Sequence, residues 1–174
     1  MPFLIAAVVL VGAIAILNLL LTMAVIRRLR RNEANTSMPM HESGPAAGSE
    51  IPSFSATTVT GEEVNETAFG EQTGLVAFFS TTCSACKPAV STLVEHIEKT
   101  GMKPDQVMAV ISGEGDERAA FTEALAGKAS VVTESEMGSL TASFSIAAFP
   151  SFVHLSGGVV DRSHSGVGNL AEAV

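Results

Sequence analysis

Two cysteines separated by two residues are the most chemically informative feature of this chain of 174 residues. Cys83 and Cys86 follow the hydrophobic run 75–79 and precede a segment with the apolar spacing of a helix. A separation of three residues at the start of a helix places both sulfur atoms on one face. The positive end of the helix dipole there favours a thiolate over a thiol. This arrangement indicates reversible disulfide exchange.

Other roles for these two cysteines have less support in the sequence. Because the chain has no further cysteine, it cannot form a four-cysteine zinc site by itself. The plain alternative is that both are ordinary buried thiols. Met38, Met40 and His41 lie in a segment without a regular pattern, so we do not expect them to bind a metal. The sequence predicts neither a metal ion nor a bound cofactor.

The residues around the cysteines predict alternating strands and helices. Strands are expected at 75–80, 106–111 and 130–133, helices at 85–100, 116–126 and 136–144, hairpins at 54–64 and 151–163, a helical turn near 66–70, and a last helix from about 169. This order predicts an α/β fold with a mixed central sheet that is flanked by helices. About 125 residues suffice for one such domain.

The N-terminal segment predicts a membrane anchor. Residues 3–26 are apolar except for Asn18 and Thr22, and about 24 helical residues span a hydrocarbon core of about 30 Å. No basic residue precedes this run, whereas Arg27–Arg31 contains four arginines, so a cleavable signal is the weaker interpretation. We therefore expect a single transmembrane helix that is retained, with the lipid bilayer as its partner through residues 3–26.

Composition divides the chain into an anchor with arginines at 1–31, a flexible linker at 32–50 and a domain at 51–174. The linker is rich in Ser, Pro, Gly, Ala and Glu and has no hydrophobic period. From Glu50 onward, 16 acidic residues face 6 basic ones, which gives a net charge near −10. Such an acidic domain is not expected to bind nucleic acid. The arginines suit anionic lipid headgroups.

Two segments resemble the signatures of the thioredoxin-like disulfide oxidoreductases. Residues 76–88, which carry the two cysteines, resemble the active-site segment of that family. Residues 144–153 are similar to its second signature, in which a cis proline precedes an apolar strand. Residues 51–54 and the Gly61 turn are similar to the N-terminal hairpin of the membrane-tethered branch, which includes TlpA-like proteins and the maturation protein MauD. The resemblance implies a thioredoxin-like fold.

The resemblance also implies a role for each matching residue. Cys83 would be the exposed nucleophile that attacks a client disulfide, and Cys86 would be the resolving thiol. Pro150 would be the cis proline opposite the cysteines, and the backbone of Phe149 would pair with a bound peptide. Lys87 would support thiolate character on Cys83 or would simply be solvated. The implied partners are protein thiol or disulfide clients and a redox partner protein.

The chain departs from the family pattern at several positions. Thr82 stands where thioredoxins carry Trp, and Ser-Ala replaces Gly-Pro between the cysteines. Ala77 stands where cytoplasmic members carry a buried acid that relays protons to the second cysteine. Deprotonation of Cys86 would then need water or another acid, for which Glu134 and Glu136 are candidates. These changes favour a specialised relative over a general cytosolic thioredoxin.

Three other functions follow from the same residues. A dedicated maturation or interaction module of the MauD kind would use the thiols without broad turnover. A thiol peroxidase needs Thr and Pro ahead of its reactive cysteine, whereas Thr81 and Thr82 lie too close to Cys83 and no proline is present there. Copper delivery of the Sco type would use His154, but those proteins have a CxxxC spacing.

The side of the membrane on which the domain lies is predicted differently by two arguments. Four arginines directly after the apolar run predict a cytoplasmic domain by the positive-inside rule. The family resemblance implies an extracytoplasmic domain, because tethered relatives act on exported clients. A catalytic cysteine pair works in either compartment. The sequence thus predicts a single-pass protein of the cell membrane and leaves its orientation open.

Overall fold

The computed structural model describes residues 12, 23, 43–168 and 170. The contacts divide the chain into one unit at 1–40 and another at 41–174, and the fold below belongs to the second. The anchor predicted at 3–26 lies outside the described residues except for Gly12 and Met23, as do linker residues 32–42. Within the described part of the chain, no helix is both long enough and apolar enough to cross a membrane.

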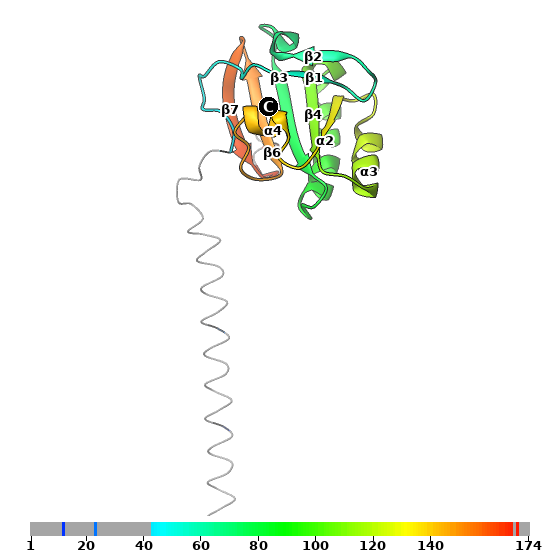
Figure 1. The fold of residues 1–174 in the computed structure, drawn as a ribbon. Coiled ribbons are helices and arrows are strands. Elements are labelled where there is room, and N and C mark those ends of the chain that lie inside the picture. The colour runs from blue at the N-terminus through cyan, green and yellow to red at the C-terminus, as the bar shows by residue number, and fades with distance from the viewer. Residues whose placement is uncertain (1–11, 13–22, 24–42, 169, 171–174) are drawn as a thin grey trace, which may run out of the picture. The chain divides into compact units, whose positions relative to one another are not determined.

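A five-stranded mixed sheet forms the centre of the domain, in the order β5-β4-β3-β6-β7 (Figure 1). Its strands are β3 (Gly74–Ser80), β4 (Val107–Ser112), β5 (Ser130–Glu134), β6 (Ser151–Ser156) and β7 (Val159–Ser165). β3, β4 and β5 run parallel, whereas β6 is antiparallel to β3 and β7 is antiparallel to β6. The predicted mixed sheet is confirmed.

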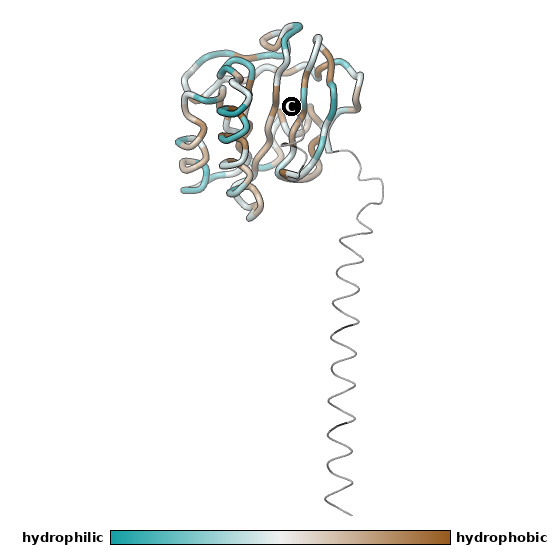
Figure 2. Tube along the Cα trace, turned by 180° about the vertical axis from the view of Figure 1, so that it is seen from behind, coloured by the Kyte–Doolittle hydropathy of each residue, from teal (hydrophilic) through white to brown (hydrophobic). Residues whose placement is uncertain are grey.

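Three helices flank this sheet: α2 (Cys86–Thr100), α3 (Asp116–Leu125) and α4 (Ser139–Ser143). α2 and α3 cover one face, which is nearer the viewer in Figure 2, and α4 covers the other, nearer in Figure 1. Successive residues of a strand point to opposite faces. Ala77 and Phe79 of β3 therefore join the α2 side, whereas Val76 and Phe78 join the α4 side.

Burial explains why these segments form these elements. All seven residues of β3 are buried, as expected for a central strand covered on both faces. The buried residues of α2 recur at helical spacing on the face toward the sheet. The helix ends at Gly101, whose left-handed backbone (φ 69°) lets its N–H donate to the carbonyl of Ile97 at 2.9 Å. The predicted strand and helix that flank the cysteines are confirmed.

Smaller elements lie along the edges of the sheet. They are β1 (Ser55–Thr57), β2 (Glu63–Asn65), and the 3-10 helices η1 (Glu66–Phe69) and η2 (Pro104–Gln106). β1 and β2 pair antiparallel, which confirms the predicted hairpin. Bridges from Thr58 to Val132 and from Glu50 to Val159 place this part of the chain against both outer strands. These bridges pair backbone groups that an exposed edge would leave free.

Residues 43–50, which the sequence assigns to the linker, contact the domain. The N–H of Gly48 donates to the carbonyl of Val160 at 2.7 Å, and the N–H of Val160 donates to the carbonyl of Ser49 at 2.9 Å. The side chain of Ser43 is buried. The described contacts of the domain thus begin at Ser43, eight residues before the predicted boundary. These contacts are polar, so no hydrophobic period marks them in the sequence.

α4 is shorter than the helix predicted at 136–144. The backbone of Met137 is left-handed (φ 53°), and such a residue cannot belong to a right-handed helix. The helix therefore begins at Ser139. The residues before it form a loop after β5, and this loop borders the site described next.

Candidate active site

The turn at 81–85 joins β3 to α2 and brings the two cysteines to the end of the central strand. The N–H of Cys83 donates to the carbonyl of Ser80 at 3.2 Å, and the N–H of Cys86 donates to the carbonyl of Cys83 at 3.0 Å. Cys86 is the first residue of α2, so Cys83 lies just outside the helix. Both side chains are free thiols. One thiol is thus presented in a turn and the other within the first helical turn.

Cys83 contacts the loop that precedes β6. Its Sγ donates a hydrogen bond to the carbonyl oxygen of Phe149 at 3.3 Å. The Phe149–Pro150 bond is cis, as the second signature predicts. Cys83 and Phe149 are half-buried, and Pro150 is buried. The fold therefore joins the two segments that the sequence singled out, although 66 residues separate them.

Cys86 lies in a different environment from Cys83. Its side chain is buried in the same apolar cluster as Ala77, so no acid of β3 takes the place that the resemblance gives to a proton relay. Burial raises the pKa of the Cys86 thiol to about 12, and its hydrogen bond with Cys83 also raises it. The N–H of Ser80, at 3.4 Å from the sulfur, lowers it. Cys86 therefore holds its proton at neutral pH.

The two carboxylates considered as proton acceptors lie in different places. Glu134 accepts hydrogen bonds from the N–H groups of Leu140 (3.0 Å) and Thr141 (3.2 Å), and from the hydroxyl of Ser112 (3.0 Å). It thereby caps α4, on the sheet face opposite Cys86. Glu136 instead lines a cavity at the cysteine end of the sheet. Water, which the sequence also allows, and Glu136 remain the candidate proton acceptors.

Ser43 holds the loop that carries Phe149. Its Oγ accepts hydrogen bonds from the N–H groups of Ala147 (3.1 Å) and Ala148 (3.2 Å). It also shares a hydrogen bond of 2.8 Å with the hydroxyl of Ser151, which lies just beyond the cis proline. A buried backbone N–H without an acceptor is costly, so this hydroxyl fixes the loop.

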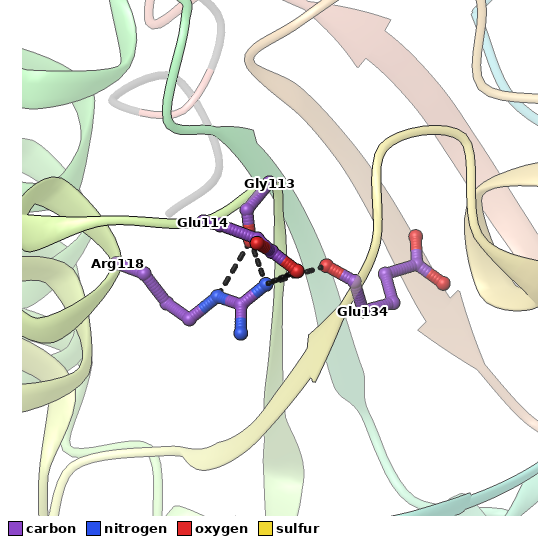
Figure 3. A network of polar contacts seen from close by, with 4 residues as sticks. All are labelled: Gly113, Glu114, Arg118 and Glu134. Carbon is purple, nitrogen blue, oxygen red and sulfur yellow. Dashed lines mark hydrogen bonds and ion pairs between the residues drawn. The ribbon is translucent and has the colours of Figure 1, made fainter.

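Arg118 of α3 joins the loops that follow β4 and β5. Its guanidinium donates hydrogen bonds to the carbonyl of Gly113 and, at 3.4 Å, to the carbonyl of Glu134 (Figure 3). The carboxylate of Glu114 lies 3.8 Å from the same group. Figure 3 shows the side chain of Glu134 pointing away from Arg118. Glu134 therefore connects two loops, through its carbonyl on one side and its carboxylate on the other.

Gly113 brings this pair of loops against the cysteine turn. Its backbone is left-handed (φ 108°), and a Cβ there would lie 2.1 Å from Oγ1 of Thr81. The N–H of Thr81 donates to the carbonyl of Ser112 at 3.0 Å. Only glycine combines this backbone conformation with so close an approach. The position of the cysteine turn thus depends on a residue of the β4–α3 loop.

A cavity of about 180 Å³ opens between these loops and the cysteine turn. Its lining residues are Ser80, Thr82, Ser112, Glu136, Met137 and Phe149. Thr82 directly precedes Cys83, and Phe149 supplies the carbonyl that Cys83 contacts. The cavity therefore adjoins the more accessible of the two sulfurs.

His154 lies far from the cysteines along the sheet. It pairs with Leu75 near the start of β3, whereas Cys83 follows the end of that strand. Its ring stacks on that of His164, with the ring centres 5.2 Å apart. Among the residues that the structure describes, no group of three or more His, Cys, Asp or Glu side chains could hold a metal ion. The fold does not bring His154 and the cysteines into one site.

No protein-family model and no curated protein sequence matches this chain. Solved structures do match its fold. The thioredoxin domain of a thiol-disulfide oxidoreductase from Bacteroides vulgatus aligns with a TM-score of 0.55 at 18% identity, over 74% of this chain and 94% of that one. The domain has a thioredoxin-like fold.

Two further structures support the same fold. A thiol:disulfide interchange protein, DsbE, from Chlorobium tepidum aligns with a TM-score of 0.56 at 17% identity, over 70% of this chain and 86% of that one. A thioredoxin from Neisseria meningitidis aligns with a TM-score of 0.54 at 16% identity, over 71% of this chain and 87% of that one. The fold expected from the two signature segments is therefore confirmed.

Sequence reasoning missed several residues that shape this site. Ser43 was assigned to the linker, and Arg118, Gly113 and Met137 were not singled out. Gly113 had a weak signal, because a glycine directly after a predicted strand indicates a tight turn. A contact across more than 100 residues, such as that of Ser43 with Ala147, has no local signal at all.

Proposed function

We propose that this protein is a membrane-anchored thiol–disulfide oxidoreductase that exchanges Cys83 and Cys86 with protein clients. One observation carries this proposal. Cys83 is accessible and contacts a backbone carbonyl of the Phe149 loop at 3.3 Å, while its neighbour Cys86 is buried and protonated. This asymmetry assigns attack to the first thiol and resolution to the second.

The exchange then runs in two steps. The thiolate of Cys83 attacks one sulfur of a client disulfide, forming a mixed disulfide and releasing the other client sulfur as a thiolate. Cys86 next loses its proton, for which the released thiolate is an acceptor, and attacks Cys83. The Cys83–Cys86 bond forms, the second client thiolate leaves, and two electrons have passed to the client. The reverse sequence oxidises a client dithiol.

Formation of the mixed disulfide also prepares the second step. Interaction with Cys83 is among the causes that raise the pKa of Cys86. When Cys83 is bonded to a client it carries no charge, so this contribution falls away. The N–H of Ser80, which favours the thiolate form of Cys86, remains at 3.4 Å. The resolving thiol thus becomes more acidic when its attack is needed.

Reduction of insulin by the full-length chain, with dithiothreitol as electron donor, tests this function. We expect catalysis by the wild type and none by Cys83→Ser, because serine supplies no thiolate. A matched control is Ser84→Ala, which changes an exposed neighbour and leaves both sulfurs in place. Equal rates for wild type and Cys83→Ser would refute the mechanism.

A dedicated maturation module of the MauD kind is the competing proposal. Thr82 in place of Trp and the missing acid at Ala77 support it, since both depart from general thioredoxins. Such a module would leave insulin unreduced but would still form a mixed disulfide with its own client. The insulin assay therefore separates broad turnover from dedicated use.

The membrane anchor belongs to the same proposal. Its support is the apolar run at 3–26, followed by four arginines. Labelling intact cells with a membrane-impermeant maleimide, with and without prior reduction, tests its orientation. Labelling of Cys83 only after reduction would indicate an oxidised pair outside the cytoplasm. Labelling only after lysis would indicate a cytoplasmic domain.

A further inference from the structure

The cavity beside Cys83 has no part in the exchange between the two cysteines themselves. It shares Thr82 and Phe149 with the nucleophile, whose thiol lies 3.3 Å from the carbonyl of Phe149. A client peptide bonded to Cys83 passes this carbonyl. A side chain next to the client cysteine is therefore within reach of the cavity, which Phe149 also lines.

The floor of the cavity is polar. Ser80 is 6% exposed and Ser112 is 1% exposed, and both belong to the ends of neighbouring parallel strands. The hydroxyl of Ser80 pairs with that of Thr82 at 3.0 Å, and the hydroxyl of Ser112 donates to Glu134 at 3.0 Å. The N–H of Thr82 also donates to the Ser80 hydroxyl at 3.3 Å, and the Ser112 hydroxyl lies 3.1 Å from that of Thr141. Each serine oxygen thus keeps at most one acceptor position for a hydrogen-bond donor that enters the cavity.

The charge of the lining is negative. Among its six described residues, Glu136 supplies the only formal charge, and its side chain is exposed at the rim. The nearest basic groups of the flanking elements are engaged elsewhere. Lys87 lies 3.5 Å from Glu117, and Arg118 is bonded to backbone carbonyls. A cation entering the cavity therefore meets a carboxylate that no described basic residue neutralises.

The walls of the cavity suit a long side chain. Met137 is 67% exposed, and the half-buried ring of Phe149 forms another wall. The backbone next to the rim packs closely on Glu134, because a Cβ at Gly138 would clash with its carboxylate. The methylene stem of Lys or Arg can pack on a thioether and a ring while its charged end stays near a carboxylate.

We propose that this cavity binds a basic side chain, Lys or Arg, next to the reactive cysteine of the client. Glu136 then acts as a specificity residue that favours such clients over those with an acidic neighbour. The inference rests on the proposed exchange at Cys83. It names a class of client that the two cysteines alone do not define.

Peptides that report the first bond exchange test this proposal. Each peptide is acetylated and amidated at its ends, and its single cysteine is joined by a disulfide to thionitrobenzoate. The Cys83 thiolate attacks the peptide sulfur, and thionitrobenzoate leaves as a coloured thiolate. The residue before or after the cysteine is Lys, Gln or Glu. Each rate with the full-length chain is divided by the rate of that peptide with dithiothreitol, which removes intrinsic reactivity.

We expect the Lys peptide to react about two- to fivefold faster than the Glu peptide in at least one of the two positions, the range for an exposed ion pair. Glu136→Gln should bring the ratio close to one, and Glu136→Lys should invert it. Glu71→Gln is the matched control. It removes the same charge from an exposed residue before β3, about 20 Å away at about 3.3 Å per strand residue, which exceeds the screening length at physiological salt.

The outcomes separate this inference from the function on which it rests. Equal normalised rates for the three peptides, with release that still requires Cys83, would overturn the cavity's role and leave the exchange function intact. A preference for Lys that survives in Glu136→Lys would also overturn it. Release no faster than with Cys83→Ser would instead refute the exchange function itself.

Discussion

Two regions of the domain contain side chains that commonly take part in catalysis. One is the turn that carries Cys83. The other, called here the histidine group, lies on β6 and β7 and consists of His154, His164 and the neighbouring Arg162. Their surroundings differ. Cys83 is only half-buried, its sulfur contacts the carbonyl of Phe149, and it adjoins a cavity. The rings of His154 and His164 stack with their centres 5.2 Å apart, and the ring of His164 also stacks on Phe152 at 5.4 Å.

Burial gives the histidine group its character. It is the largest cause of the lowered pKa of His154, which falls to about 3, and the positive charge of Arg162 adds to it. The pKa of His164 is lowered for the same two reasons. Within the described part of the chain, Nε2 of His154 and both ring nitrogens of His164 lack hydrogen-bond partners. Neutral rings that are packed in this way behave as ordinary aromatic core residues. The exposure of a side chain and its contacts therefore distinguish a reactive site from a packed cluster better than the residue type does.

The largest expected effect comes from removing the resolving thiol. Cys86→Ser should accumulate a mixed disulfide between Cys83 and its client, because no second thiol displaces the client. Non-reducing electrophoresis and mass spectrometry of the adduct measure this. His164→Phe, which keeps an aromatic ring at the stacked position, should turn over within about twofold of wild type. Accumulation of an adduct or loss of activity in His164→Phe would contradict the purely structural role of the histidine group.

Gly113→Ala should displace the cysteine turn, because Gly113 packs directly against it. The new Cβ would lie 2.1 Å from Oγ1 of Thr81, and the left-handed backbone (φ 108°) disfavours alanine. We expect a loss of about 2–3 kcal/mol in the free energy of unfolding, together with slower exchange. Gly127→Ala is the control, because its φ is also positive (70°) but nothing lies within 4 Å of the added Cβ. That change should cost about 1 kcal/mol and leave exchange unaffected.

Acid should destabilise the domain through His154. The pKa of His154 is about 3 in the folded state against 6.5 in its ordinary state, so between these values the unfolded chain binds more protons. The free energy of unfolding is therefore highest above pH 6.5, falls as the pH drops, and levels off near pH 3. With partial exposure taken into account, we expect a loss of about 1 kcal/mol from pH 7 to pH 5.

A variant without His154 checks the origin of this pH dependence. His154→Leu should show a flatter profile of unfolding free energy, measured by denaturant titration at each pH. Its exchange rate at pH 7 should match wild type, since the ring lies near the start of β3 and Cys83 beyond its end. An unchanged profile would assign the pH dependence to other groups.

The smallest expected effect concerns Lys87. Its ammonium lies 3.5 Å from the carboxylate of Glu117, and their side chains are 76% and 36% exposed. Pairs of this kind contribute about 0.5 kcal/mol or less, so Lys87→Ala should barely change thermal stability. Exchange should change by less than about twofold. A tenfold slower exchange would instead show that Lys87 supports the Cys83 thiolate, as the family resemblance allows.

The parts of the fold that the sequence predicts well are those with a local physical signal. The apolar run at 75–80 predicts β3, and the helical spacing after Cys86 predicts α2. Gly101 predicts where α2 ends. The cis bond before Pro150 follows from the family signature rather than from any local pattern. The two cysteines were therefore placed correctly at the end of a central strand.

The parts that the sequence does not predict depend on contacts between distant residues. The start of α4 is set by the left-handed backbone of Met137, which nothing in the hydrophobic pattern indicates. Glu134 was considered for acid–base chemistry, whereas its carboxylate caps α4. The cavity beside Cys83 is assembled from the ends of β3 and β4, the cysteine turn and two loops. Such assemblies arise only when the chain is folded.

The position of Ser43 has a mechanical consequence. Among the described residues 43–168, Ser43 is the first to contact the domain, and it holds the N–H groups of Ala147 and Ala148. The carbonyl that faces Cys83 belongs to the next residue along, Phe149. A force applied at Ser43 therefore acts on the Phe149 loop and, through the hydroxyl of Ser151, on the first residue of β6. Tension at this one residue would reach the carbonyl that faces Cys83.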